Sequence, residues 1–193
     1  KKLLRETLTR YERDYERIFE ENHRLMRFLL EINTPIPPAL RAAAELTLSS
    51  ELRTVLEELR DNALSIGAAR GQLRALMAEA RTLGIRLEVD EARRIVEGLI
   101  LEHMRRLQAS PRREVAREMV ELIDLGDTLG VGLNLWEVQN LFWELVSAGA
   151  PEFDRDIALR LGERLCFDRR SLEPRLRGQR GATLVEMRAA SSF

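Results

Sequence analysis

The sequence predicts an all-α protein, a helical bundle of about seven or eight helices with a long helix at its start and a duplicated helical hairpin. Three observations lead to this prediction. Apolar residues recur at steps of three and four, as on one face of an amphipathic helix. Prolines and glycines separate the periodic segments, and one helix–connector–helix pattern occurs twice.

The longest periodic segment opens the chain and predicts one helix of about 30 residues. Its apolar positions are Leu4, Leu8, Tyr11, Tyr15, Ile18, Leu25 and Leu29. The helix is expected to end at residues 33–38, where three prolines remove donors and push the preceding residues out of the helical region. Asn22 is the one polar residue in the apolar seam, and such a residue often fixes register or partner number. This predicts either a homodimer through Leu4–Ile32 or packing of the helix on the chain's own bundle, which needs no partner.

The next segment is expected to hold two shorter helices. Pro38 suits the first turn of a helix over Ala39–Leu48. Ser49 or Ser50 offers an N-cap oxygen to a helix over Glu51–Arg60, and a looser connection is expected over Asp61–Gly71.

An internal repeat follows Gly71. Thr82–Glu91 aligns with Thr128–Glu137 at an offset of 46 residues, and the apolar positions on both sides match. Gly84 and Gly130 are expected to end the first helix of each copy in the left-handed conformation. Asn134 and Glu137 resemble a capping box at the start of the helix that follows. Two copies are fewer than a solenoid usually needs, so they predict duplicated hairpins in one bundle.

The remaining boundaries complete one expected domain over residues 1–174. Ser110 and Pro111 open the helix between the two copies, residues 149–151 close the last strong helix, and Asp154–Leu165 forms a shorter final one. Residues 175–193 are expected to be an Arg-rich, loosely held tail. Because the chain begins inside a segment with helical periodicity, we expect it to be part of a longer protein.

Composition narrows the function classes. With 45% hydrophobic and 33% charged residues, the chain is neither disordered nor collagen-like, and its longest uncharged stretches are too short for a membrane helix. The single Cys166 cannot form an internal disulfide, which favours the cytoplasm. Residues 114–168 carry 12 acidic and 4 basic residues and also hold most of the late aromatics, so nucleic acid is not an expected partner.

Few residues are suited to catalysis. His23 and His103 each lack a second His or Cys at helical ligand spacing, and Cys166 lacks a His partner, so no metal, cofactor or catalytic residue is predicted. The face formed by Glu114, Glu118 and Glu121 is expected to be solvated.

The strongest candidate site is aromatic and lies on the helix over residues 135–147. Its core stripe is expected to comprise Leu135, Val138, Phe142 and Leu145. The candidate site residues are Trp136, Gln139, Asn140 and Trp143. Indoles stack on the apolar face of a pyranose while amides bond its hydroxyls, so the group predicts a carbohydrate- or partner-facing surface. The alternative is that both tryptophans are buried in the bundle.

Several of these segments resemble a known family, the uncharacterised helical domain found C-terminal to catalytic modules of glycoside hydrolase family 57 type. The similar segments are His23–Leu29, Pro35–Glu45, Ser50–Arg53, Leu83–Leu87 and Leu135–Leu145. The resemblance covers residues 8–173, and its distinctive parts are the proline loop and the Trp-Gln-Asn helix. The family domain is longer at its start, and the tail after Pro174 departs from its pattern.

The resemblance implies a place in an α-glucan-active protein whose barrel-type module lies upstream and holds the catalytic carboxylates. In related enzymes a helical C-terminal part packs on the barrel and helps to wall the substrate cleft. The resemblance therefore implies a non-catalytic accessory domain, whose Trp136 and Trp143, with the amides between them, face the catalytic module or an α-glucan chain. A stand-alone interaction or dimerisation module is the alternative.

Overall fold

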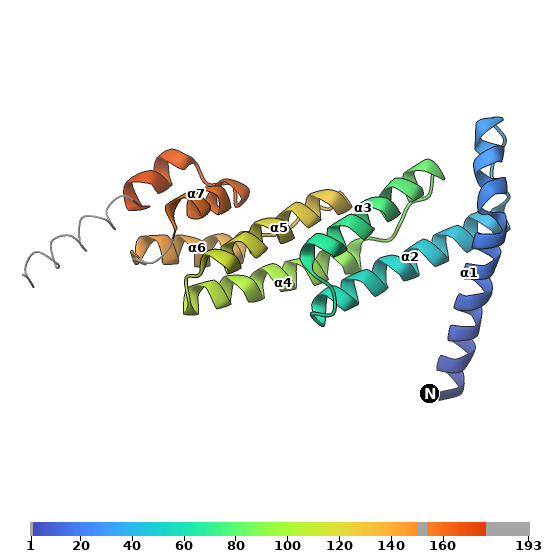
Figure 1. Ribbon diagram of the computed structural model, residues 1–193, viewed down its shortest axis with the longest axis horizontal. Coiled ribbons are helices and arrows are strands. Elements are labelled where there is room, and N and C mark those ends of the chain that lie inside the picture. Colours follow the sequence, from blue (N-terminus) through green and yellow to red (C-terminus); the bar gives the residue numbers. More distant parts are fainter. Residues whose placement is uncertain (1, 150–153, 177–193) are drawn as a thin grey trace, which may run out of the picture. The chain divides into compact units, whose positions relative to one another are not determined.

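The computed structural model describes residues 2–149 and 154–176, and within these ranges all regular structure is helical. The predicted all-α class is thus confirmed, and so is the long first helix, which has 30 residues. A helical stretch over residues 169–176 follows the numbered helices. The numbered helices are α1 (Lys2–Glu31), α2 (Pro38–Arg60), α3 (Ile66–Thr82), α4 (Asp90–Ala109), α5 (Arg113–Leu129), α6 (Trp136–Ser147) and α7 (Arg155–Arg164) (Figure 1).

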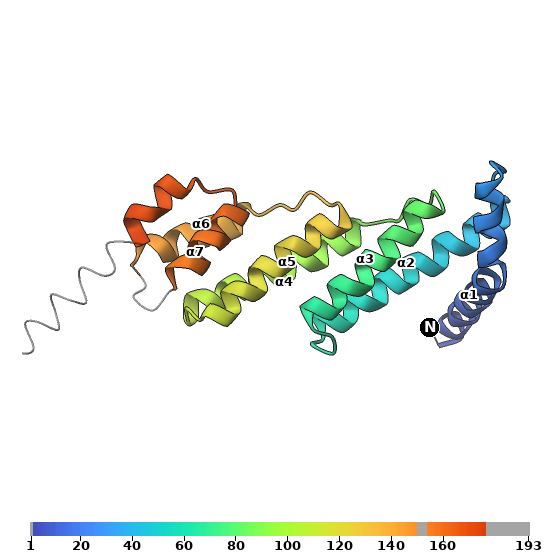
Figure 2. The same cartoon turned by 45° about the horizontal axis from the view of Figure 1, so that its top comes forward.

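The chain divides into two compact units, Lys1–Ala92 and Arg93–Phe193. In the first, α1 and α3 both pack on α2, and in the second α5 packs on α7. Figure 2 shows α2 beside α3 in the first unit, and α4 beside α5 in the second. The expected single domain over residues 1–174 stays a prediction. The expected tail lies outside the described residues, apart from Arg175 and Leu176, which end the helical stretch that begins at residue 169.

The expected division of α2 at Ser49 or Ser50 is wrong, because the helix runs through both serines. Thr47 and Leu48 before the serines and Leu52 after them are buried on one continuous face. A serine inside a helix costs only about 0.5 kcal/mol relative to alanine. Burial of that face therefore outweighs the preference of serine for a cap.

The connection after α2 is also shorter than the expected Asp61–Gly71. α3 begins at Ile66, and the Ser65 Oγ accepts a hydrogen bond from the Ala68 N–H at 3.3 Å. Ser65 thus supplies the N-cap that ends the connection and starts the helix.

The two copies of the internal repeat end their first helix in the same way. Gly84 has φ +65°, and its N–H donates to the Arg81 carbonyl at 3.1 Å. The Ile85 N–H donates to the Ala80 carbonyl at 2.8 Å, which completes a Schellman motif.

In the second copy, Gly130 has φ +68° and the equivalent bonds run from Gly130 to Asp127 and from Val131 to Gly126, both at 3.1 Å. Each equivalent donor and acceptor lies 46 residues further along the chain, as the repeat predicts. Ile85 and Val131, the residues after the glycines, are buried in both copies.

The same cap occurs at three helix ends where the residue in the left-handed conformation is not glycine. These residues are Asn33 after α1, Asn62 after α2 and Cys166 after α7, with φ of 54°, 57° and 63°. At Cys166, the Cys166 N–H donates to the Glu163 carbonyl at 3.1 Å and the Phe167 N–H to the Gly162 carbonyl at 2.9 Å. A residue other than glycine or asparagine rarely adopts this conformation, so Cys166 is the strained member of the set.

Replacing Cys166 with glycine is expected to raise the free energy of unfolding by about 0.5–1 kcal/mol, because glycine adopts the left-handed conformation without steric cost. Cys166 is exposed, so no buried contact is lost with its side chain. Chemical denaturation of Cys166→Gly and Cys166→Ala beside the parent measures the effect. Equal stability of the two variants would contradict the inference that the left-handed conformation strains residue 166.

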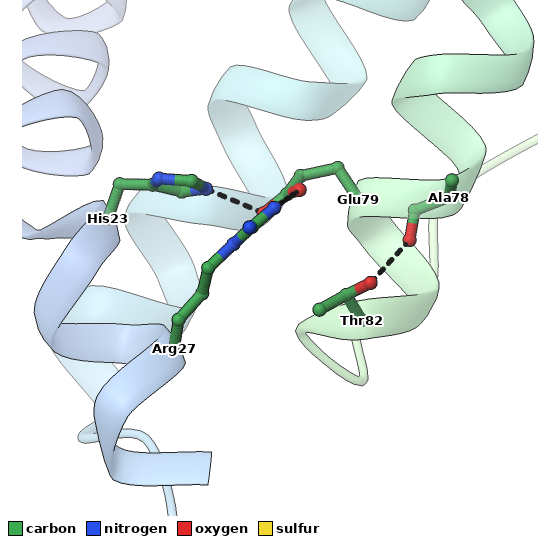
Figure 3. A network of polar contacts seen from close by, with 5 residues as sticks. All are labelled: His23, Arg27, Ala78, Glu79 and Thr82. Atoms are coloured by element: carbon green, nitrogen blue, oxygen red, sulfur yellow. Dashed lines mark hydrogen bonds and ion pairs between the residues drawn. The ribbon is translucent and has the colours of Figure 1, made fainter. Parts of the chain in front are cut away.

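In the first unit, α1 is held by packing on one side and by an ion-pair cluster at the edge of that side. Phe19 and Met26 are buried. Figure 3 shows His23 and Arg27 of α1 pointing at Glu79 of α3. The His23 Nε2 lies 2.6 Å from Glu79 Oε1, and the Arg27 guanidinium pairs with both carboxylate oxygens.

In the second unit, α7 lies close to its neighbours because Gly162 has no side chain. A Cβ at this position would overlap Leu172 Cδ1 and lie 3.3 Å from Phe142 Cε1. Leu172, from the stretch 169–176, and Phe142, from α6, are both fully buried. Arg164 at the end of α7 also pairs with Asp124 of α5 at 2.8 Å.

Candidate functional site

α6 carries the four candidate residues, and its first turn is anchored to α4. The Trp136 N–H donates to Asn134 Oδ1 at 3.3 Å, so Asn134 supplies the oxygen at this helix start. Glu137 does not complete the expected capping box, because its carboxylate pairs instead with Arg105 of α4 at 3.1 Å. The Asn134 N–H in turn donates to Glu97 of α4 at 2.6 Å. The two contacts fix where α6 begins relative to α4.

The inner face of α6 matches the predicted core stripe. Val138, Phe142 and Leu145 are buried, while Leu135 at the N-cap is half-buried. The Gln108 Nε2 of α4 also donates to the Leu141 carbonyl at 3.3 Å. Side chains on the opposite face are therefore presented from a helix with a fixed position in the second unit.

The four candidates lie on one side of α6, because their spacing is i, i+3, i+4 and i+7. They differ in exposure. Trp136 is 71% exposed and Asn140 is also exposed, whereas Gln139 and Trp143 are half-buried. The alternative interpretation, in which both tryptophans are buried in the bundle, is thus wrong for Trp136.

Gln139 and Trp143 make contacts within the chain. The Gln139 Nε2 donates to the Leu165 carbonyl at 2.9 Å. The Trp143 ring stacks on Phe167 with 5.7 Å between centroids and 9° between planes, and the Arg175 guanidinium lies 4.1 Å from its centroid. These two candidates therefore hold the segment after α7 against α6.

Phe167 and Arg175 are residues of this surface that the sequence did not indicate. Each lies more than 20 residues from Trp143 and belongs to no pattern that pairs it with α6. Composition even placed Arg175 in the expected loose tail, although its side chain packs on an indole.

Electrostatics at the end of α7 stabilise the same region. A hydrogen bond from the Arg164 guanidinium to Asp127 raises the pKa of Arg164, burial opposes that shift, and attraction to Asp124 adds to it. The charged pair therefore holds the end of α7 to α5, close to the segment that covers Trp143.

A second exposed surface lies on α1 in the first unit. Leu25, Phe28 and Ile32 are about half exposed, at 46%, 54% and 52%, and Tyr11 further along the helix is similar. The sequence pattern indicated Leu25 and Tyr11 as seam residues, but it did not indicate that their side of the helix is left uncovered. The same helix buries Phe19 and Met26, so α1 has apolar residues on two sides.

The residues considered for metal or acid chemistry lie apart. Among the described residues no group of three or more His, Cys, Asp or Glu is placed to hold a metal ion. The His103 Nδ1 donates to the Leu99 carbonyl at 2.8 Å, and its Nε2 lies 3.5 Å from Glu118. Glu118 thus contacts a buried histidine, while Glu114 and Glu121 of the same face are exposed as expected. None of the described helices is long and apolar enough to cross a membrane.

Comparison of the chain with models of protein families, with curated proteins and with solved structures finds no match.

Proposed function

We propose that the chain is a non-catalytic helical accessory domain of a glycoside hydrolase-like protein of family 57 type, acting on α-glucans. In this role the domain packs on, or extends, the substrate cleft of an upstream catalytic module. The proposal is supported by the resemblance of the proline loop and of α6 to the helical domain of that family. It includes a cytoplasmic location, which the single Cys166 favours.

The observation that carries the proposal is the exposure of Trp136. An indole with 71% of its surface accessible has lost little water on folding, and such residues are enriched where a partner or ligand covers them. Asn140 lies one turn away on the same side and is exposed, so an amide is available beside the ring.

The anchoring of α6 fits this role. A ring that stacks on a sugar or fills a pocket in a partner gains affinity when its backbone is already fixed. The bonds from α4 to Glu137, Asn134 and Leu141 fix the backbone around Trp136 while leaving the indole uncovered. Within the group of four, Trp136 and Asn140 make the outward contact, and Gln139 and Trp143 position the segment after α7.

The test replaces Trp136 in the protein together with its upstream catalytic module. Trp136→Ala is expected to lower either turnover of a soluble α-glucan or binding of it by about tenfold, because an anchoring aromatic contact contributes on the order of 1.4 kcal/mol. Leu46→Ala is the matched control, since Leu46 is also a large exposed apolar residue but lies on α2. Unchanged turnover and unchanged binding in folded Trp136→Ala protein would overturn the proposal.

Tryptophan fluorescence then distinguishes a contact of Trp136 with sugar from a contact of Trp136 with the catalytic module. The chain has two tryptophans, so Trp143→Phe leaves Trp136 as its only indole. A saturable emission change of the isolated Trp143→Phe chain with α-glucan indicates stacking of Trp136 on sugar. If emission changes only when the catalytic module is added, Trp136 contacts the module.

A stand-alone module that dimerises through Leu4–Ile32 is the second candidate function. The observation that favours it is the row of exposed apolar side chains on α1, which includes Leu25, Phe28 and Ile32. In this candidate function a second copy of the chain binds this row, so the oligomeric state of the chain tests it.

A further inference from the structure

The outer side of α1 repeats with the period of a helix that packs on another helix. Tyr11, Ile18, Leu25 and Ile32 are each seven residues apart, so they form one row along the helix. Phe28 lies beside this row, one turn from Leu25 and from Ile32. From the first to the last of these residues the row is about 32 Å long.

The first unit leaves most of this row uncovered, since Tyr11, Leu25 and Ile32 are exposed while Ile18 is half-buried. α1 is also not free to turn the row inward. Phe19 and Met26, on the neighbouring side of the helix, are buried. His23 and Arg27 hold the same side to Glu79. Rotating α1 to bury the row would expose two buried side chains and break the ion pairs.

The charges beside the row suit an identical helix better than a strongly charged partner. The Arg17 guanidinium lies 3.4 Å from the Asp14 carboxylate and 3.9 Å from the Glu21 carboxylate. The charged side chains along this edge of the row therefore have both signs and largely neutralise each other within α1. Because these charges are paired within each helix, two copies of this edge repel each other only weakly. A strongly acidic or strongly basic partner would gain little from it.

The pattern of burial also selects the direction of pairing. In a parallel pair, the flank that holds Phe28 in one copy would face the opposite flank of the other copy, which holds Phe19 and Met26. That opposite flank is already covered by the first unit of the same copy. In an antiparallel pair related by a two-fold axis, the flank that holds Phe28 faces the same flank of the other copy, and both are uncovered.

We propose that α1 packs antiparallel against α1 of a second copy through the row Tyr11, Ile18, Leu25 and Ile32. A two-fold axis between residues 21 and 22 places Ile18 opposite Leu25 of the other copy and Tyr11 opposite its Ile32. This inference deepens and rests on the second candidate function, and it is independent of the role of Trp136.

The oligomeric state of the full chain tests the pairing. Sedimentation equilibrium of the Cys166→Ser chain across micromolar concentrations is expected to show a monomer–dimer equilibrium. Leu25→Asp combined with Phe28→Asp is expected to raise the dissociation constant at least 100-fold, whereas Leu46→Asp, an equally exposed site on α2, leaves it unchanged. Both substituted sites are exposed, so circular dichroism of the variants is expected to match the parent.

Cross-linking tests the direction. In the Cys166→Ser background, mixing an Ile18→Cys chain with a Leu25→Cys chain under oxidation is expected to give a disulfide between the two. Leu25→Cys alone is expected to stay uncross-linked. A Leu25→Cys homodimer would overturn the antiparallel arrangement, and a monomer at every concentration would overturn the pairing itself. Neither result changes the outcome of the Trp136→Ala experiment, so failure of the accessory-domain proposal is recognised separately.

Discussion

Replacing Gly162 with valine is expected to lower the free energy of unfolding by about 3 kcal/mol, because the new side chain has no space at the centre of the second unit. A Cβ there would overlap Leu172 Cδ1 and press on Phe142. Both neighbours are fully buried, so neither side chain can move toward solvent without opening the core. The substitution therefore separates α7 from α6 and from the helical stretch 169–176.

Gly98 provides the matched control for this prediction. It also lies inside a helix, but nothing stands within 4 Å of a Cβ built there and the residue is exposed. Gly98→Val is expected to change stability by less than about 0.5 kcal/mol, since valine forms helix somewhat better than glycine. Urea denaturation followed by circular dichroism compares the two variants. Similar losses at both positions would show that the cost comes from valine in a helix and not from packing at Gly162.

The sequence predicted those parts of the fold that depend on local chemistry. The prolines after α1 and the glycines at 84 and 130 act on their own backbone, so their effects can be recognised without knowing what packs nearby. The cap at Cys166 has the same hydrogen bonds as the cap at Gly84, but a cysteine gives no signal for a left-handed residue. Its conformation is imposed by the packing of the chain on both sides.

The errors around α2 and α3 have a related cause. Ser49, Ser50 and Ser65 are all chemically able to cap a helix, and only Ser65 does. What decides between them is whether the apolar face continues past the serine. Leu48 and Leu52 continue that face across Ser49 and Ser50, so the helix does not end there.

The candidate site was only partly accessible to sequence reasoning. The spacing of the four residues places them on faces of α6 beside its core stripe, because helical periodicity determines direction. Periodicity does not determine what covers those faces. Trp143 is covered by Phe167 and Arg175, and Trp136 has no such cover, although the two indoles have nearly the same direction on the helix.

Replacing Glu79 with glutamine is expected to destabilise the first unit by about 1–2 kcal/mol near neutral pH, because it leaves Arg27 and His23 without their carboxylate. Burial alone would raise the pKa of Glu79. Hydrogen bonds from Arg27 and His23, together with their positive charge, outweigh burial and lower that pKa below its ordinary value of 4.5. The native state therefore favours the ionised carboxylate more than the unfolded chain does.

The lowered pKa determines how this contribution depends on pH. It is fully present above the unfolded pKa and is lost as the pH falls through the folded pKa, where the native carboxylate takes up a proton. The stability difference between the parent and Glu79→Gln is thus expected to shrink as the pH falls below the ordinary carboxyl pKa of 4.5.

The matched control is Glu102→Gln, because Glu102 is exposed on α4 and lies outside the His23–Arg27–Glu79 cluster. Its stability difference from the parent is expected to stay below about 0.5 kcal/mol across the same range. Denaturation at pH 7, 5 and 3.5 measures both variants. A Glu79→Gln difference that stays constant down to pH 3.5 would mean that its cost arises from packing and not from the charge. A stability difference that shrinks as the pH falls would instead show that the ionised Glu79 carboxylate holds α1 in place through His23 and Arg27. The same contacts oppose rotation of α1, which keeps the apolar row on its outer side.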